Sequence, residues 1–145
     1  MVTYGNFILR LLAAVLAGML IGFERECHHK SAGLRTNTLV ATGAALFVLL
    51  SVKLTQNQGD ITRIVGQVVT GIGFLGGGII FKEGINIRGL TTAATVWCSA
   101  AVGSFAGAGY FVETLIGVVI IVLVNTILVP IDKWLENKVK DKLQP

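Results

Sequence analysis

Five long, almost uncharged apolar segments constrain the fold of this chain more than any other feature. They cover residues 4–23, 36–54, 64–81, 90–108 and 111–131, and polar or glycine-rich residues separate them. A helix needs about 20 apolar residues to cross the hydrocarbon core of a bilayer. Only 14% of the residues are charged, against roughly 25% in an ordinary soluble domain. The sequence therefore predicts an all-α, polytopic membrane bundle of about five transmembrane helices.

The chain divides into a transmembrane part, residues 1–131, and a short charged tail, residues 132–145. On a helix, Ile131 and the tail residues Leu135, Val139 and Leu143 share one side, and lysines surround the other. Such an amphipathic helix is expected to lie along the inner membrane surface, with Trp134 at the head-group level. A solvent-exposed helix and a linker to a further domain are the alternatives.

Lysine and arginine are distributed unevenly over the predicted loops. The first loop, the third loop and the tail together carry nine of the 12 basic residues. The second loop is flanked by Lys53 and Arg63, and the fourth has none. Because short cytoplasmic loops retain basic residues, the amino terminus is expected outside and the carboxyl terminus in the cytoplasm. The positive net charge is then explained by the orientation of the chain in the membrane, and no nucleic-acid partner is predicted.

The segment GIGFLGGGIIF at residues 71–81 matches the glycine pattern of a dinucleotide-binding loop. That loop also needs an acidic residue about 20 positions further on. Glu83 is too close, and the next carboxylate is Glu113, so a nucleotide site is excluded.

No nucleophile is accompanied by a base and an orienting third group, so the sequence predicts no enzyme, no cofactor and no metal site. Cys27 and Cys98 fall at different membrane depths, so no disulfide is expected.

Glycines four residues apart occur as Gly18/Gly22, Gly73/Gly77 and Gly103/Gly107. Such pairs let helix backbones approach closely in a membrane, so tight packing and a homodimer through a glycine-lined face are expected. Arg10 lies on the same stripe as Gly18 and Gly22, which directs it towards protein. The alternative is that the triple glycine at residues 76–78 breaks the third helix and exposes carbonyl groups to an ion.

A partial repeat relates two of the predicted helices. Residues 33–45 laid over residues 89–101 give six identities in thirteen positions without a gap. We interpret this as a parallel repeat of helix hairpins 1–2 and 3–4. The biased small-residue composition is the alternative explanation.

The repeat places two helix amino termini side by side at the cytoplasmic face. Three threonines are then positioned to cap free N–H groups: Thr36, Thr91 and Thr92. Glu24 and Glu83 are positioned to neutralise the helix dipoles. Arg35 and Arg88 are the expected ion-pair partners of these two carboxylates. The alternative is a polar vestibule for an anionic head group, a divalent cation or a partner's charged loop. Two carboxylates at a membrane edge would hold magnesium only loosely. The candidate residues of this cytoplasmic-face cluster are Glu24, Arg25, Arg35, Asn37, Glu83, Arg88 and Thr91.

The fourth segment is unusually polar for a membrane helix. Thr92, Thr95 and Ser99 share one face with Gly103, and Cys98 lies on the adjoining face. This helix is therefore expected inside the bundle, where Gln67 and Thr70 of the third helix could meet it. The polar groups would then either form interhelical hydrogen bonds or line a path for a solute. No carboxylate falls at the midplane, which argues against a proton pump. Asn125 is assigned to a lipid-facing fifth helix. The candidate intramembrane residues are Arg10, Gln67, Gly73, Gly77, Thr92, Thr95, Cys98 and Ser99.

Four blocks of this sequence resemble the MgtC/SapB/YhiD family of bacterial inner-membrane proteins. They read GFER at residues 22–25, GLRTNTLVATGAALF at 33–47, GIGFLGGGIIFKEG at 71–84 and RGLTTAATVWCSAAVG at 88–103. The resemblance implies a role in magnesium limitation, acid stress and, in pathogens, survival inside host cells. It also implies membrane protein partners such as a magnesium-transport ATPase or the ATP synthase, and it does not imply magnesium transport by this chain.

Two departures from the family pattern narrow these expectations. Thr91 stands where virulence-type members carry asparagine in the block RGLNTAAT, which weakens the case for virulence-type activity, whereas Cys98 matches their cysteine. Those members continue into a soluble carboxy-terminal domain, so this chain resembles a short or truncated form. Two functions remain open: a non-enzymatic regulatory membrane protein, and a small ion or solute channel with a path lined by helices three and four.

Overall fold

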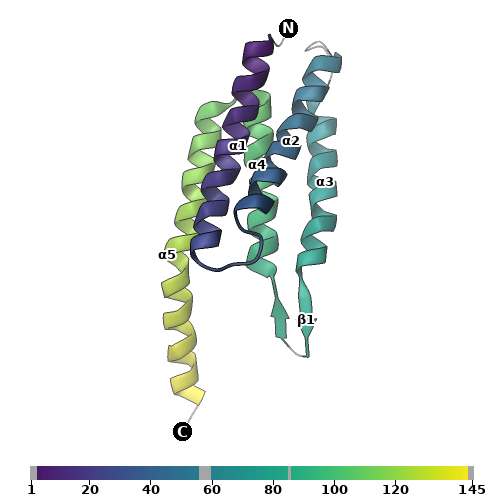
Figure 1. Ribbon diagram of the computed structural model, residues 1–145. Coiled ribbons are helices and arrows are strands. Elements are labelled where there is room, and N and C mark those ends of the chain that lie inside the picture. Colours follow the sequence, from purple (N-terminus) through teal and green to yellow (C-terminus); the bar gives the residue numbers. More distant parts are fainter. Residues whose placement is uncertain (1–2, 56–59, 85, 144–145) are drawn as a thin grey trace.

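The computed structural model describes residues 3–55, 60–84 and 86–143, and these form five helices and one small sheet. The helices are α1 (Tyr4–Cys27), α2 (Leu34–Thr55), α3 (Ile61–Ile79), α4 (Leu90–Ala108) and α5 (Phe111–Leu143). They run alternately down and up the bundle, so the two termini lie at opposite ends (Figure 1). The predicted all-α helical bundle is confirmed.

Three of the helices are long and apolar enough to cross a membrane. They are Tyr4–Cys27, Leu34–Thr55 and the stretch Phe111–Asp132 of α5. The other two, α3 and α4, have 19 residues each and carry threonines and glycines that lower their hydropathy. They lie beside the three apolar helices in the same bundle (Figure 1), and their crossing of the membrane stays a prediction.

Helix α4 forms the centre of the bundle and contacts the other four helices. Its close approach to α2 depends on glycine, because a Cβ atom at Gly103 would lie 2.1 Å from the carbonyl oxygen of Ala41. Gly107 meets the backbone of Ala45 in the same way, and Gly18 of α1 meets the α2 backbone beside Asn37. The predicted tight packing is therefore confirmed for two of the three glycine pairs.

Helix α3 is attached to the bundle by a narrow strip of side chains. Ile72 is buried, whereas most of the helix is exposed. A Cβ atom at Gly73 or Gly77 would meet nothing within 4 Å, so this pair packs against no other part of the described chain. The helix continues without interruption through the triple glycine to Ile79. The alternative of a helix broken at these glycines is therefore wrong.

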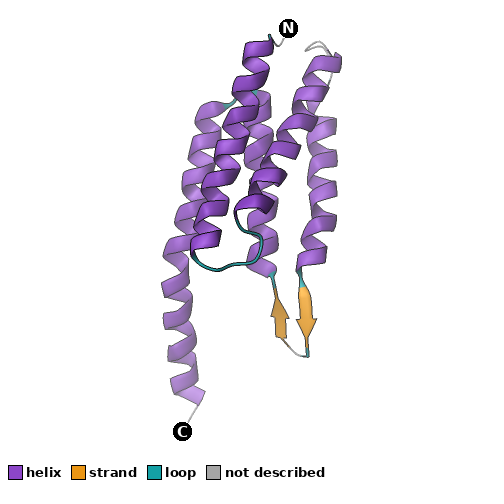
Figure 2. Ribbon diagram, in the orientation of Figure 1, coloured by secondary structure: helices purple, strands orange, loops and turns teal. Residues whose placement is uncertain are grey.

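The connection between α3 and α4 is a β-hairpin that sequence analysis did not predict. Strands β1 (Phe81–Glu83) and β2 (Asn86–Arg88) pair antiparallel, with Phe81 opposite Arg88 (Figure 2). Gly84 has a φ of +63° in the turn, which glycine adopts without strain. The expected third segment therefore ends two residues early, and Phe81 belongs to the sheet.

The two helix hairpins run in the same direction, as the repeat requires, but their connections differ. An irregular turn of residues 28–33 joins α1 to α2, whereas the β-hairpin joins α3 to α4. In both pairs an amide near the start of the second helix donates to the carbonyl of the glycine that precedes this helix: Asn37 N donates to Gly33 O, and Ala93 N donates to Gly89 O. The repeat stays a prediction.

The predicted tail continues α5 as one helix that passes through Pro130 to Leu143. It extends beyond the rest of the bundle at the end opposite the amino terminus (Figure 1). Within it, Lys138 Nζ lies 4.6 Å from the centre of the exposed Trp134 ring. The side chains of Val139 and Leu143, which complete the predicted apolar side, lie outside the described residues. The tail's position along the membrane surface stays a prediction.

Asp60 fixes the start of α3 at the other end of the bundle. Its carboxylate accepts hydrogen bonds from the hydroxyl and from the amide of Thr62, the second at 2.9 Å. These two bonds favour the ionised carboxylate and hold the pKa of Asp60 below its ordinary value. The cap thereby satisfies a first-turn donor of α3 that has no partner within the helix.

Candidate functional site: a polar cavity between α1, α4 and α5

The strongest candidate site lies at the hairpin end of the bundle, which we define as the end that holds the turn of residues 28–33 and the β-hairpin. A cavity of about 670 Å³ opens there between α1, α4 and α5. One part of its lining is polar and the rest is aliphatic. The polar lining consists of Glu24, Arg25, Lys30, Thr91, Thr92, Asn125 and Asp132, and the aliphatic lining includes Ile87, Leu90, Val124, Leu128 and Val129.

Arg25 is the most deeply buried charge of this cavity, with 3% of its surface exposed. It stands in the last turn of α1, where its Nη2 atom donates to Thr92 Oγ1 at 2.6 Å and to the Ser31 carbonyl at 3.3 Å. Its Nε atom is buried and has no hydrogen-bond partner among the described residues. A buried cationic donor without an acceptor is costly, so Arg25 is the residue here that most needs a further ligand.

Glu24 is 8% exposed, and both of its carboxylate oxygens have partners. Oε2 accepts a hydrogen bond from Asn125 Nδ2 at 3.1 Å, and Oε1 lies 3.1 Å from His28 Nδ1. Thr95 Oγ1 in turn lies 3.4 Å from Asn125 Oδ1. These contacts link α1 to α5 and α5 to α4, and they stabilise the Glu24 carboxylate in addition to the attraction between its charge and that of Arg25.

Asn37 forms a second buried polar contact, which is not part of the cavity lining. It is fully buried, and its Oδ1 atom accepts from Ser99 Oγ at 2.8 Å. Its Nδ2 atom donates to the carbonyl groups of Ala32 and Gly33. Asn37 therefore holds the turn before α2 against the middle of α4, which is a positioning contact.

The amino terminus of α4 faces the same cavity and carries no side-chain cap. Its N-cap residue is Gly89, with a φ of +90° and no capping side-chain hydrogen bond. The expected threonine capping is therefore wrong at this helix: the Thr92 hydroxyl accepts from Arg25, and Thr91 is exposed at the cavity. At α2 Thr36 is exposed, and Glu26 Oε2 accepts from Leu34 N at 3.2 Å.

The structure brings only part of the predicted cytoplasmic-face cluster together. Arg25, Glu24 and Thr91 share the cavity. Glu83 and Arg88 pair with each other on the exposed β-hairpin, with 3.3 Å between Oε2 and Nε. Arg35 is exposed and lines a separate hollow with Glu26. The expected pairing of Glu24 with an arginine is replaced by its contacts with Asn125 and His28.

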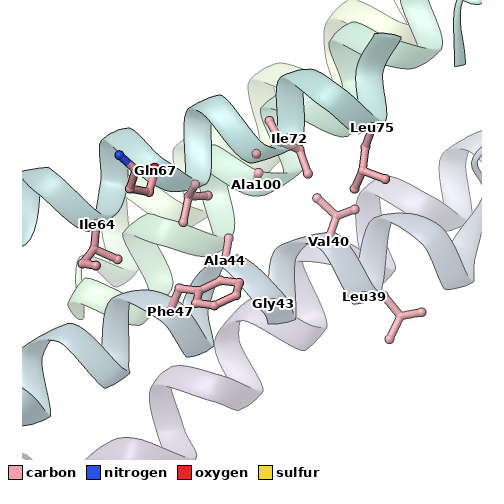
Figure 3. A pocket seen from close by; sticks show the side chains of 12 residues that line it. Leu39, Val40, Gly43, Ala44, Phe47, Ile64, Gln67, Ile72, Leu75 and Ala100 are labelled. Carbon is pink, nitrogen blue, oxygen red and sulfur yellow. The ribbon is translucent and has the colours of Figure 1, made fainter. Parts of the chain in front are cut away.

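The predicted intramembrane residues also divide into two groups. Thr92, Thr95 and Ser99 are buried, and Arg10 Nη1 donates to the Gly107 carbonyl at 3.2 Å, so these face protein as expected. Cys98 is half-buried, and both cysteines are free. Gln67 does not face α4: it is exposed beside an apolar groove of about 590 Å³ between α2 and α3 (Figure 3). Thr70 bonds to the carbonyl of Gly66 in its own helix.

Three residues that contribute to the site are not among the predicted site residues: Asn125, His28 and Ser31. Asn125 was assigned to the lipid-facing rim, but it is half-buried and bonds Glu24. A lone amide in an otherwise aliphatic helix is a signal for an inward partner, because burial in lipid without one is costly. His28 and Ser31 lie in a loop whose path the sequence does not reveal. Within the part of the chain that the structure describes, no three His, Cys, Asp or Glu residues gather to hold a metal ion.

Comparisons with known proteins agree with the four sequence blocks. The pattern of the MgtC family matches residues 11–134. Protein MgtC of Brucella abortus is 56% identical over 126 residues, which are 87% of this chain and 52% of that protein. Protein MgtC of Salmonella typhimurium is 53% identical over 122 residues, 84% of this chain and 52% of that protein. An uncharacterized protein of Synechocystis is 50% identical over 135 residues, 93% of this chain and 57% of that protein. The chain thus spans about half the length of the curated relatives it matches, and no solved structure matches it.

Proposed function

We propose a regulatory, non-enzymatic role for this multi-pass membrane protein, which belongs to the MgtC family. In this proposal the chain lies in the bacterial inner membrane with its amino terminus outside, so that the hairpin end faces the cytoplasm. It responds to magnesium limitation and acid stress, and supports intracellular survival in pathogens, by contacting a membrane protein partner. A magnesium-transport ATPase and the ATP synthase are the partners that the family resemblance suggests.

The observation that carries this proposal is the contrast between the interior and the hairpin end. Inside the bundle, the polar groups of α4 are used within the chain: Ser99 bonds Asn37, Thr95 bonds the Thr91 carbonyl, and Ser104 bonds the Ala100 carbonyl. At the hairpin end, the exposed Arg35 and the exposed pair Glu83–Arg88 remain available to a charged partner loop. This distribution favours recognition at the surface.

The alternative is a small channel with a path between α3 and α4. The space between these helices is a groove of about 360 Å³ whose lining is almost entirely apolar, including Val68, Ile72 and Trp97. An ion needs polar groups to replace its hydration shell. The lining of this groove therefore gives the channel less support than the regulatory role.

Ion flux and partner capture separate the two functions. We expect liposomes containing the purified chain to release magnesium, potassium and protons no faster than empty liposomes. We expect a photo-cross-linker on the exposed Cys27 to capture a membrane protein in cells grown at low magnesium, and capture to fall in Arg35→Gln or Arg88→Gln. Flux that is lost in Thr95→Val, with capture unchanged in both arginine variants, would contradict the regulatory role and support the channel.

We also propose that two copies associate through the glycine face of α3. Gly73 and Gly77 meet nothing within 4 Å in the described chain, and small residues four apart are the usual contact of paired membrane helices. Gly73→Leu is expected to reduce the dimer fraction in mild detergent severalfold, measured by chemical cross-linking. Gly5→Leu, at an open position on α1, serves as the control. Equal dimer fractions in the two variants would refute an α3 interface.

A further inference from the structure

Two independent features converge on the polar cavity, and both are donors without an acceptor. The first is Arg25, whose buried Nε atom has no partner among the described residues. The second is the amino terminus of the 19-residue helix α4, which no side chain caps. The first amide groups of a helix lack intrahelical acceptors and carry a partial positive charge. A cavity that joins such an amino terminus to a buried guanidinium matches the chemistry of phosphate binding.

The charges in and around the cavity restrict which phosphate fits. Lys30 adds a second cation, whereas Glu24 and Asp132 add two carboxylates, so the four charged groups of the lining balance. Glu24 is hydrogen-bonded by Asn125 and lies beside His28; its charge attracts the Arg25 guanidinium, but the buried Nε atom of Arg25 still has no acceptor among the described residues. A neutral site with one uncompensated donor group suits a singly charged phosphodiester better than a phosphate dianion.

The aliphatic half of the lining indicates what carries the phosphate. Leu90 of α4 and Val124, Leu128 and Val129 of α5 extend the cavity along the apolar part of the bundle. Val124 and Leu128 are about half exposed, so the cavity is continuous with the surface that lipid covers in a membrane. The cavity also lies at the level where α1 ends, which is the head-group level in the predicted topology. A phospholipid presents a phosphodiester and acyl chains in this arrangement.

We propose that this cavity binds the phosphate oxyanion of a phospholipid, with the Arg25 guanidinium and the amino terminus of α4 as its ligands. Thr92 positions the guanidinium through the 2.6 Å contact with its Nη2 atom, which leaves Nε for the phosphate. The bound lipid would fasten α1, α4 and α5 together at the hairpin end. This inference goes beyond the proposed regulatory role, because lipid retention is a property of the chain without any partner.

Lipid retention by the purified full chain tests the site. The chain is extracted in an uncharged detergent from vesicles of phosphatidylglycerol and phosphatidylethanolamine, and bound lipid is counted by native mass spectrometry. We expect one retained phospholipid per chain, and a retained fraction about tenfold lower in Arg25→Gln, because a charge-assisted hydrogen bond is lost. Arg35→Gln, which removes an exposed arginine outside the cavity, should retain as much lipid as the wild type.

Three further measurements make the outcome decisive. Far-UV circular dichroism establishes that Arg25→Gln is folded; if it is not, Leu128→Trp fills the aliphatic half and is expected to lower retention similarly. A phosphate-free glycolipid with the same acyl chains should not be retained. Inorganic phosphate is titrated by ³¹P NMR, and Arg25-dependent binding of phosphate without lipid retention would support the oxyanion site with free phosphate as its source. Equal retention by wild type and the folded variant, or by phospholipid and glycolipid, would overturn the proposal.

Discussion

Gly103→Ala is expected to destabilise the bundle by about 3 kcal/mol, at the upper end of the usual range of about 1–3 kcal/mol for overpacking a core. The added Cβ atom would lie 2.1 Å from the Ala41 carbonyl oxygen and 2.6 Å from its Cα atom. Both are backbone atoms, so no side-chain rotation relieves the contact. The helices α2 and α4 must move apart, which weakens the packing around Ala45 and Ala100 as well. Unfolding in mixed micelles of increasing SDS fraction, followed by circular dichroism, measures the change.

Gly73→Ala is the matched control for this prediction. It introduces the same methyl group into a helix, but at a position where a Cβ atom meets nothing within 4 Å. Measured on the monomer, below the concentration at which two copies associate, its expected effect is a change between zero and a stabilisation of about 1 kcal/mol, because alanine is the better helix former. A Gly103→Ala variant as stable as Gly73→Ala would mean that α2 and α4 are not in backbone contact.

A comparison of Gly103 with Gly73 shows which parts of this fold the sequence predicts. The spacing of four is identical in Gly103/Gly107 and in Gly73/Gly77, and it predicts a surface suited to a neighbouring helix, which the structure confirms for Gly103/Gly107. It does not indicate which neighbour, because that depends on how five helices share a limited contact area. Gly103 meets α2, whereas Gly73 meets nothing in the described chain. Helix number and order follow from local hydropathy, but the pairing of faces is a tertiary property.

The candidate site shows the same limit at the level of side chains. Inward-facing Thr92, Thr95 and Ser99 are predictable, because their spacing places them on one face of a single helix. The partner of Glu24 is not predictable, because Asn125 lies 101 positions away on another helix. Arg88 was expected to form an ion pair near the amino terminus of α4, and it pairs with Glu83. The β-hairpin that carries this pair, however, moves it out to solvent, where an ion pair contributes little.

Asn37→Ala is expected to destabilise the fold by about 2–4 kcal/mol, because it removes three hydrogen bonds from a fully buried position. Ser99 Oγ loses its acceptor, the Ala32 carbonyl loses its side-chain donor, and the Gly33 carbonyl keeps only the backbone amide of residue 37. The small cavity left by the amide adds to this cost. The loss also frees the turn before α2, so the effect should appear in amide hydrogen exchange at residues 32–34 as well as in the SDS unfolding midpoint.

Ser99→Ala and Asn6→Ala distinguish this network from a general effect of losing a polar side chain. Ser99→Ala removes one bond but leaves Asn37 its two contacts with the turn, so about 1 kcal/mol is expected. Asn6 is exposed on α1, and its replacement should be neutral. The double variant Asn37→Ala/Ser99→Ala should lose less stability than the sum of the two single losses, because each single loss includes the bond between Asn37 and Ser99. Strict additivity, or an Asn37→Ala variant no less stable than Asn6→Ala, would show that this bond does not hold α2 against α4.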